Sequence, residues 1–245
     1  MGEPINNQPQ QPIPTPLLSH TSTLLAFQRS CYNLCNSILT LFAQALEIEP
    51  DWFTSRHDPA KGPTGTVFRL LYYPHTDDYD DELDIRAGAH SDYGSITLLF
   101  QQAGQPGLEI KGPEEEWAPV PVDPAASNGT NHSGNSNGTT KPLPILVNIG
   151  DLLEDWTSGL LKSTVHRVIF PQNDEAAAKT DRYSMAYFCH PLDDAELDPV
   201  PSRFVREHAA RKGDGERNGT RRKDGKVLTA KDHLMERLGA SYTVK

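Results

Sequence analysis

Hydrophobic residues recur at three- and four-residue steps in the segment that begins at Thr21. The apolar positions of this segment are Leu24, Leu25, Phe27, Leu34, Ile38, Leu41, Phe42 and Leu46. This period is typical of an amphipathic helix with one apolar face. The sequence therefore predicts a helix that ends near Ile48, before Pro50. A second helical pattern, TAKDHLMERLGASY, lies near the C-terminus, where we expect a final helix packed on the outside of the domain.

Between these helices lie short runs of the β-branched and aromatic residues that favour strands. Gly, Pro, Asn and Asp separate the runs and mark turns. Because strands and helices do not alternate, we expect an antiparallel sandwich or jelly roll, which is a mainly β fold with flanking α-helices. The predicted strands cover residues 67–73, 95–100, 108–110, 144–149, 163–170 and 182–188.

Two polar segments divide the chain. Residues 1–20 are rich in Pro, Gln and Asn and bury too little apolar surface to offset the entropy of ordering, so we predict a disordered tail. Residues 124–142 contain hardly any large apolar side chain and predict a flexible insertion between strands. We expect a helical segment over 21–63, one β domain over 64–200, and a C-terminal extension with the final helix over 201–245.

Charge and cysteine content narrow the range of partners. The chain has 23 Lys and Arg against 33 Asp and Glu, a net charge of -10 that repels nucleic acid and anionic membranes. We therefore expect a small-molecule substrate, and the oligomeric state stays open. The three cysteines have no Cys-x-x-Cys spacing, which argues against a disulfide framework or a thiolate zinc site. Without a secretion signal in the sequence, we expect a cytoplasmic protein.

Three side chains have the residue types of a metal site. In an extended chain, residues two apart point to the same face, so His90 and Asp92 can offer an imidazole and a carboxylate to one point. A third ligand must come from elsewhere, and His166 interrupts the apolar pattern of a predicted strand. Two histidines and one carboxylate form the facial triad of non-haem Fe(II) oxygenases. By itself this pattern is weak, because a surface His and Asp two residues apart are common.

A buried anion site is the second candidate. Arg182 and Ser184 share one face of the predicted strand 182–188, and together they offer a planar guanidinium and a hydroxyl. These groups suit the carboxylate of a ligand inside a barrel. An ion pair between Arg182 and an internal Glu is an equally good explanation of the arginine at this point.

These segments, taken in order, resemble the isopenicillin N synthase-like family of Fe(II)- and 2-oxoglutarate-dependent dioxygenases. The resemblance extends over residues 67–199 and rests on FRLLYYP, GAHSDYGSITLLFQ, GLEI, W-x-PVP, LVNIGDLLEDWTSGLLKSTVHRV and RYSMAYFCHP. It implies a double-stranded β-helix that holds iron at His90, Asp92 and His166. It also implies that Arg182 and Ser184 bind the distal carboxylate of 2-oxoglutarate and that Tyr73 hydrogen-bonds this co-substrate. Leu71 stands where the family often has an asparagine, two residues before that tyrosine.

The resemblance further implies the reaction. Such an enzyme uses Fe(II), 2-oxoglutarate and O₂, with ascorbate as an optional reductant, to hydroxylate, desaturate or cyclise a small organic molecule of secondary metabolism. The family usually carries a further N-terminal region, whereas this chain reaches the family's middle helix almost at once. The N-terminal region is therefore expected to be missing, through a natural short form or a truncated gene model, and one wall of the substrate pocket with it.

Other functions remain open at this stage. An iron oxidase similar to isopenicillin N synthase would use the same triad without 2-oxoglutarate. A truncated homologue without activity would act only as a binding protein. A zinc hydrolase could use the same two histidines and aspartate, but it would leave Arg182 and Ser184 without a role.

Four further features are interpreted as structural. We expect Asp151 to cap a helix, His190 to lie on the surface at the end of a strand, and Trp117 to pack on a sheet. The acidic run at residues 77–82 lacks the spaced ligands of a calcium loop and is expected to be a solvated loop.

Overall fold

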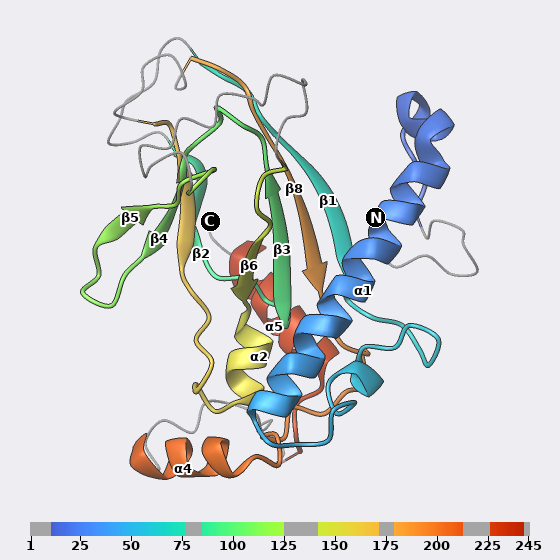
Figure 1. Cartoon of the computed structure of the whole chain (residues 1–245), viewed down its shortest axis with the longest axis vertical. Coiled ribbons are helices and arrows are strands. Elements are labelled where there is room, and N and C mark those ends of the chain that lie inside the picture. The colour runs from blue at the N-terminus through green and yellow to red at the C-terminus, as the bar shows by residue number, and fades with distance from the viewer. Residues whose placement is uncertain (1–10, 77–84, 125–141, 172–178, 213–225, 243–245) are drawn as a thin grey trace.

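The computed structural model describes residues 11–76, 85–124, 142–171, 179–212 and 226–242. Their core is a pair of four-stranded antiparallel sheets, seen side by side in Figure 1. The first sheet has the order β1 (Val67–Tyr73), β8 (Arg182–Cys189), β3 (Ile96–Gln101) and β6 (Leu146–Ile149). The second has the order β2 (Ile85–His90), β7 (His166–Ile169), β4 (Leu108–Lys111) and β5 (Trp117–Pro119). This arrangement confirms the predicted double-stranded β-helix.

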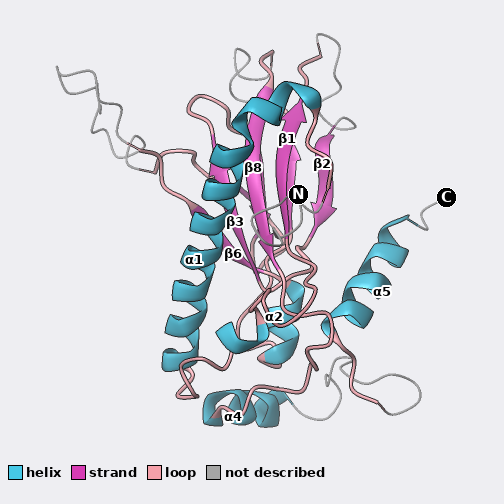
Figure 2. Ribbon diagram, turned by 90° about the vertical axis from the view of Figure 1, so that its right-hand side faces the viewer, coloured by secondary structure: helices cyan, strands magenta, loops and turns pink. Residues whose placement is uncertain are grey.

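The long helix α1 (Thr21–Ala45) lies against the outer face of the first sheet, as Figure 2 shows. Its buried residues include Cys31, Cys35, Leu39 and Ala43, a series at four-residue steps that forms one face of the helix. Phe27 reaches the sheet, with its ring centroid 5.3 Å from that of Phe68 and 5.0 Å from that of Phe100. The main hydrophobic core therefore lies between α1 and this outer face.

The remaining helices lie at the lower end of the sheets and behind them (Figure 1). They are α2 (Asp151–Trp156), α4 (Arg203–Lys212) and α5 (Ala230–Tyr242). The short 3₁₀ helix η1 (Thr15–His20) leads directly into α1, and a second one, η2 (Thr54–Arg56), follows α1 in the chain. Leu152, Leu153 and Trp156 bury α2 in the core that α1 also contacts. None of the described helices has the length and apolar character that a membrane span requires.

The predicted end of the first helix is three residues too far along. Helix α1 ends at Ala45 because Glu47 adopts a left-handed backbone with φ of 54°. The Ile48 N–H then donates to the carbonyl of Ala43 at 3.0 Å, which satisfies a helix-terminal acceptor. The tail also differs from expectation at residues 15–20, where η1 forms and leads directly into α1. Proline at its start favours such a turn, since its fixed φ matches helical backbone.

The predicted strands are present, and two further strands escaped sequence analysis. Strand β2 has the sequence IRAGAH, with a glycine and two alanines, and β5 is only WAP. Neither run has a β-branched or alternating pattern, and both form because a neighbouring strand pairs with them. Residues 77–82 and most of the predicted insertion at 124–142 lie outside the described residues.

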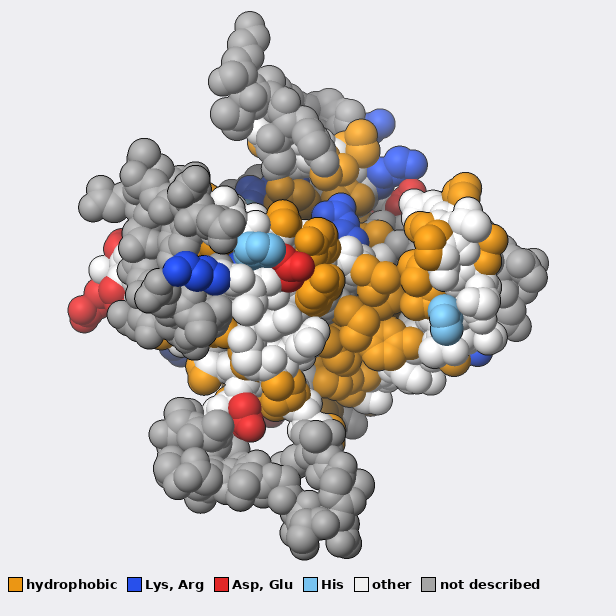
Figure 3. Space-filling view, turned by 90° about the horizontal axis from the view of Figure 1, so that it is seen from above, with side chains coloured by type: hydrophobic (Ala, Val, Ile, Leu, Met, Phe, Trp, Pro, Cys, Tyr) orange, Lys and Arg blue, Asp and Glu red, His pale blue; other side chains and the backbone are white. Residues whose placement is uncertain are grey.

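Part of the outer face of the first sheet keeps exposed hydrophobic side chains. Leu70, Tyr72 and Tyr183 are all exposed, and the rings of the two tyrosines stack with centroids 5.1 Å apart. Figure 3, which looks down on the molecule, shows hydrophobic side chains gathered in a broad area of this view. Strand β1 also forms one edge of the sheet among the described strands.

Candidate active site

A cavity of about 270 Å³ lies between the inner faces of the two sheets. Both sheets line it, because inward side chains alternate with outward ones along each strand. The lining is mostly apolar, with contributions from Leu71, Leu99, Leu108, Ile110, Leu146, Val168 and Phe188. Its polar side chains include every residue that the sequence singled out for the metal and anion sites. The cavity is therefore the place where those two predicted sites meet.

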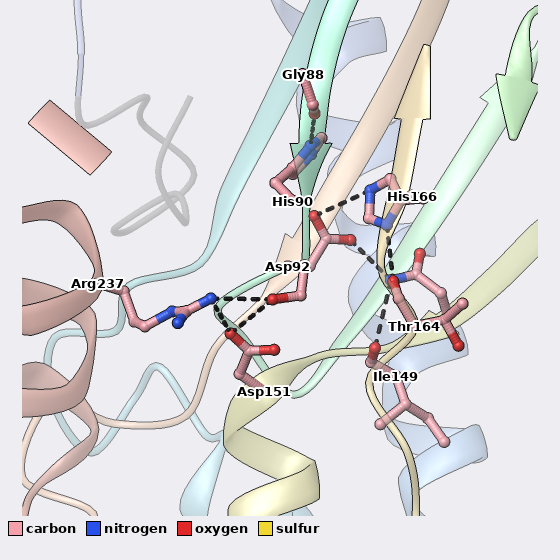
Figure 4. Close-up of polar contacts among 10 residues, drawn as sticks. Gly88, His90, Asp92, Ile149, Asp151, Thr164, His166 and Arg237 are labelled. Atoms are coloured by element: carbon pink, nitrogen blue, oxygen red, sulfur yellow. Dashed lines mark hydrogen bonds and ion pairs between the residues drawn. The ribbon is translucent and has the colours of Figure 1, made fainter. Parts of the chain in front are cut away.

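His90, Asp92 and His166 converge at this cavity (Figure 4). His90 ends β2 and pairs with His166, which begins β7, so the two imidazoles lie next to each other with ring centroids 4.4 Å apart. Asp92 lies in the loop that leads from β2 to β3. One ligand atom from each residue lies within 4.8 Å of the other two.

Backbone hydrogen bonds orient both imidazoles toward this point. Nδ1 of His90 is 2.7 Å from the carbonyl of Gly88, and Nδ1 of His166 is 3.0 Å from the carbonyl of Thr164. Because a carbonyl can only accept, each Nδ1 carries the proton, and in the neutral ring Nε2 keeps its lone pair. Nε2 of His166 lies 3.7 Å from Oδ1 of Asp92. Two electron-rich atoms at this separation fit a shared cation.

Asn148 holds the carboxylate of Asp92 in place. Asp92 is only 5% exposed, and Nδ2 of Asn148 on β6 donates to its Oδ2 at 2.7 Å. The other oxygen, Oδ1, is the one that faces His166. Sequence analysis missed Asn148, although its place two residues after Leu146 on the same strand puts both side chains on the inner face.

Arg182 and Ser184 lie on the inner face of the first sheet. Arg182 is 1% exposed, and burial lowers the pKa of its guanidinium, which stays cationic at neutral pH. Its Nη1 donates to Oγ of Ser184 at 3.4 Å and its Nη2 to Oε1 of Gln101 at 3.3 Å, while Nε is buried without a partner. No described carboxylate pairs with Arg182, so the alternative of an internal Glu finds no support there.

A buried guanidinium without a counter-ion is costly, and an anionic ligand would offset that cost. Gln101, the second residue that sequence analysis missed, ends β3 opposite Ser184. Tyr73 is paired with Arg182 across β1 and β8, and its ring centroid lies 5.4 Å from Cζ of the arginine. Leu71 lies opposite Ser184 in the same register and also lines the cavity. The donor set is therefore suited to a small dicarboxylate beside a metal.

Two predictions about neighbouring residues are wrong. Asp151 does not cap α2, since Gly150 occupies the N-cap position without a side-chain cap and Asp151 is the first helical residue. The carboxylate of Asp151 instead accepts from Ser91 and pairs with Arg237. His190 is not on the surface but is only 5% exposed, and this burial lowers its pKa to about 3. The long-range packing that surrounds His190 leaves no sign in the sequence beside it.

Trp117 packs on the second sheet rather than lining the cavity. It begins β5, opposite Lys111, and the guanidinium of Arg167 lies 4.2 Å from its ring centroid. Arg167 also forms an ion pair with Glu109 at 2.8 Å. These contacts agree with the expected packing role of the tryptophan.

Comparison with known proteins identifies a family model and relatives that are similar to this chain. The sequence model of the 2OG-Fe(II) oxygenase superfamily matches residues 64–130 and 129–191. The UPF0676 protein of Schizosaccharomyces pombe is 39% identical over 189 residues, which are 75% of this chain and 50% of that protein. Validamycin A dioxygenase of Streptomyces hygroscopicus subsp. limoneus is 31% identical over 189 residues, 76% of this chain and 45% of the enzyme.

The fold is similar to that of a solved protein from Neurospora crassa. The full-length Neurospora protein in complex with alpha-KG and thymine superposes with a TM-score of 0.70 and 28% identity. The superposition covers 99% of this chain and 64% of the Neurospora chain. The present chain spans about half the length of the curated relatives that it matches.

Proposed function

Because the chain belongs to the 2OG-Fe(II) oxygenase superfamily, we propose that it is a non-haem Fe(II)- and 2-oxoglutarate-dependent dioxygenase acting on a small organic molecule. The observation that carries this proposal is the convergence of two imidazoles and a carboxylate on one point of the cavity. Arg182 lines the same cavity. In this proposal His90, Asp92 and His166 hold the iron. Bound Fe(II) would supply the oxidation, in which O₂ converts 2-oxoglutarate to succinate and CO₂ while the substrate is oxidised.

The side chains around the metal position have distinct tasks. The carbonyls of Gly88 and Thr164 fix the protonated Nδ1 atoms, so both Nε2 lone pairs are available as ligands. Asn148 occupies Oδ2 of Asp92 and leaves Oδ1 as the ligand atom. Three protein ligands leave the other coordination positions open to 2-oxoglutarate and O₂.

The dicarboxylate would lie along the inner face of β1 and β8. Arg182 and Ser184 would bind its distal carboxylate, because the unpartnered Nε of Arg182 and the hydroxyl of Ser184 supply donors in a buried site. Tyr73, directly across from Arg182, would donate a further hydrogen bond to the co-substrate. The apolar side chains of the cavity would keep water away from the reacting groups.

The cavity also suggests the substrate class. Arg69 lines it from β1, with its guanidinium 5.6 Å from the ring centroid of Phe188 and no carboxylate partner among the described residues. A compact organic molecule with an apolar body and one acceptor or anionic group suits such a lining. We propose a metabolite of secondary metabolism as the substrate. Two of the similar proteins are named with small molecules: one is validamycin A dioxygenase, and the Neurospora protein was solved in complex with thymine.

Location is part of the same proposal. The described cysteines Cys31, Cys35 and Cys189 are all free and buried. Free thiols are typical of proteins in a reducing compartment, and we propose the cytoplasm.

The co-substrate site can be tested with one conservative substitution. Arg182→Lys keeps the positive charge but loses the planar fork, so 2-oxoglutarate should bind about 10- to 100-fold more weakly. Calorimetric titration of 2-oxoglutarate into the Mn(II)-loaded chain measures this change, and titration of Mn(II) should show unaltered metal affinity. Arg203→Lys, which alters a surface ion pair with Glu47, is the matched control and should change neither affinity.

Metal titration, succinate formation and oxygen uptake together separate the alternative functions. Asp92→Ala and His166→Ala should abolish Mn(II) binding, and succinate should form only in the parent chain with Fe(II), 2-oxoglutarate and O₂. Oxygen uptake without 2-oxoglutarate binding would indicate an iron oxidase similar to isopenicillin N synthase. A parent chain that binds neither Mn(II) nor 2-oxoglutarate would contradict the proposal and favour a binding protein.

A further inference from the structure

The C-terminal helix α5 contacts the loop that carries Asp92. Arg237, in the second half of this helix, places its guanidinium beside Ser91 and over the ring of Tyr93, with Cζ 5.1 Å from the ring centroid. Ser91 lies between His90 and Asp92 in the chain, 146 residues before Arg237. An element from the far end of the sequence thus reaches the proposed metal site.

Three side chains form a closed set of polar contacts at this point (Figure 4). Nη2 of Arg237 lies 2.7 Å from Oδ2 of Asp151 and donates to Oγ of Ser91 at 2.9 Å. The hydroxyl of Ser91 in turn donates to the same Oδ2 at 3.0 Å. Each member comes from a different part of the fold. Ser91 belongs to the loop between β2 and β3, residues 91–95, which we call the metal-site loop; Asp151 belongs to α2 and Arg237 to α5. None of the three is itself a proposed ligand, so the set can act on the metal only through the residues that it holds.

Backbone contacts transmit this arrangement to Asp92. The Asp151 N–H donates to the carbonyl of Asp92 at 2.7 Å, and the Leu152 N–H donates to that of Gly94 at 3.2 Å. The first turn of α2 therefore holds the loop on one side, while Ser91 holds it through its side chain. Displacement of Asp151 would shift both contacts and with them the carboxylate of Asp92.

A second contact fixes the register of α5 on α2. Nε2 of His233 lies 3.5 Å from Oδ2 of Asp155. His233 and Arg237 are four residues apart on α5, and Asp155 and Asp151 are four residues apart on α2. Residues four apart share one face of a helix, so the two pairs lie one turn apart along a common interface. Arg237 therefore meets Asp151 in a defined geometry.

We propose that Arg237 is a positioning residue, which acts through Ser91 and Asp151 to hold the loop so that His90 and Asp92 converge with His166. This inference rests on the proposed function, because it concerns the same metal site. It adds α5 to the elements that complete that site. Outer contacts of this kind commonly change metal affinity when they are removed, since the ligands lose their fixed orientation.

Arg237→Ala tests the proposal in the full chain. Co(II) affinity, measured by calorimetry, should fall about 10- to 100-fold, and the visible spectrum of the bound Co(II) should change. Arg237→Lys keeps a cationic donor that can reach Asp151 or Ser91, and it should restore most of the affinity. Lys231 lies on the same helix as Arg237 and forms an ion pair with Asp193 outside the helix. Lys231→Ala is therefore the matched control, with unchanged affinity and spectrum.

Hydrogen exchange of residues 90–95 in the metal-free chain supplies an independent measurement. The exchange of this loop should become faster in Arg237→Ala and stay unchanged in Lys231→Ala. Should Arg237→Ala fail to fold, Ser91→Ala removes the shared hydroxyl and leaves the ion pair with Asp151, and it should weaken Co(II) binding several-fold.

Unchanged Co(II) affinity, spectrum and loop exchange in the folded Arg237 or Ser91 variant would overturn the proposal. An equal loss in Lys231→Ala would also overturn it, because docking of α5 as a whole would then explain the effect. Absence of Co(II) binding in the parent chain would instead contradict the proposed function, and the exchange of the loop would still decide whether Arg237 orders it.

Discussion

His57 shows how a single buried residue is fixed in one protonation state. Its Nδ1 lies 2.7 Å from the carbonyl of Phe53 and its Nε2 lies 2.9 Å from Oγ of Ser95. The carbonyl can only accept, so Nδ1 carries the proton and Nε2 accepts from the hydroxyl. Complete burial lowers the pKa of this imidazole to about 4. His57 is therefore neutral at physiological pH, and its role is structural, because it holds Ser95 just before β3 begins.

The lowered pKa of His57 predicts that the folded protein loses stability in weak acid. In the unfolded chain the histidine binds a proton below about pH 6.5, whereas in the folded chain it does so only below about pH 4. The unfolded state therefore gains stability as the pH falls from 6.5 to 4, by up to about 3 kcal/mol from this group. Urea unfolding at pH 7 and pH 5 should show a lower free energy of unfolding at pH 5.

His57→Gln is the matched variant for this test. Its amide offers both N–H donors and a carbonyl acceptor but does not titrate. We expect the difference in the free energy of unfolding between pH 7 and pH 5 to become smaller in the variant. Part of the difference should remain, because burial also lowers the pKa of His190. An equal difference in parent and variant would contradict the assignment to His57.

The approach of α2 to the metal-site loop is decided by a glycine. A Cβ atom at Gly150 would lie 2.3 Å from the carbonyl oxygen of Gly94 and 2.9 Å from that of Asp92. Both atoms belong to backbone, which cannot move aside as the end of a flexible side chain can. The contact between α2 and the loop therefore requires glycine at this position.

Gly150→Ala should separate these two elements. We expect the free energy of unfolding to fall by about 1–3 kcal/mol, as for overpacked buried sites, and Mn(II) affinity to fall with it because the loop moves. Thermal melting and calorimetry measure the two effects.

Gly239→Ala is the control for this substitution. Gly239 lies in α5, and apart from neighbouring backbone of its own helix no described atom lies within 4 Å of the position of an added Cβ. Alanine should raise stability by about 0.5–1 kcal/mol there, since it favours helix over glycine. Similar losses in the free energy of unfolding for Gly150→Ala and Gly239→Ala would show that the close backbone approach at Gly150 has no special effect.

At the scale of the whole molecule, the outer face of the first sheet carries an uncovered hydrophobic area. It consists of Leu70, Tyr72 and Tyr183 on β1 and β8, and β1 is an edge strand among the described strands. Exposed apolar side chains beside a free strand edge favour association between chains.

We therefore expect the isolated chain to self-associate as its concentration rises. Light scattering coupled to gel filtration should show species larger than the monomer, and Leu70→Lys together with Tyr183→Lys should return the chain to a monomer. Met235→Lys, at an equally exposed apolar residue of α5, is the control and should leave association unchanged. A parent chain that stays monomeric at high concentration would contradict this expectation.

The sequence predicted the elements whose pattern is local. The alternation of FRLLYY and RYSMAYF placed β1 and β8 correctly and put Arg182 and Ser184 on one face, because side chains alternate along any strand. The four-residue period placed α1 within a few residues of its end. Strands β2 and β5 could not be found in this way, because their short, glycine- or proline-containing runs form only where a neighbouring strand pairs with them.

For the site, the sequence supplied the residue types and the tertiary structure decided their contacts. His90, Asp92 and His166 were recognisable as a possible triad, but Asp92 lies in a loop beyond the end of β2, so strand alternation alone does not place it. The roles of Asn148 and Arg237 and the burial of His190 depend on contacts between distant parts of the chain. Local patterns fix how a segment folds, whereas hydrogen bonds and burial across the fold depend on which segments meet.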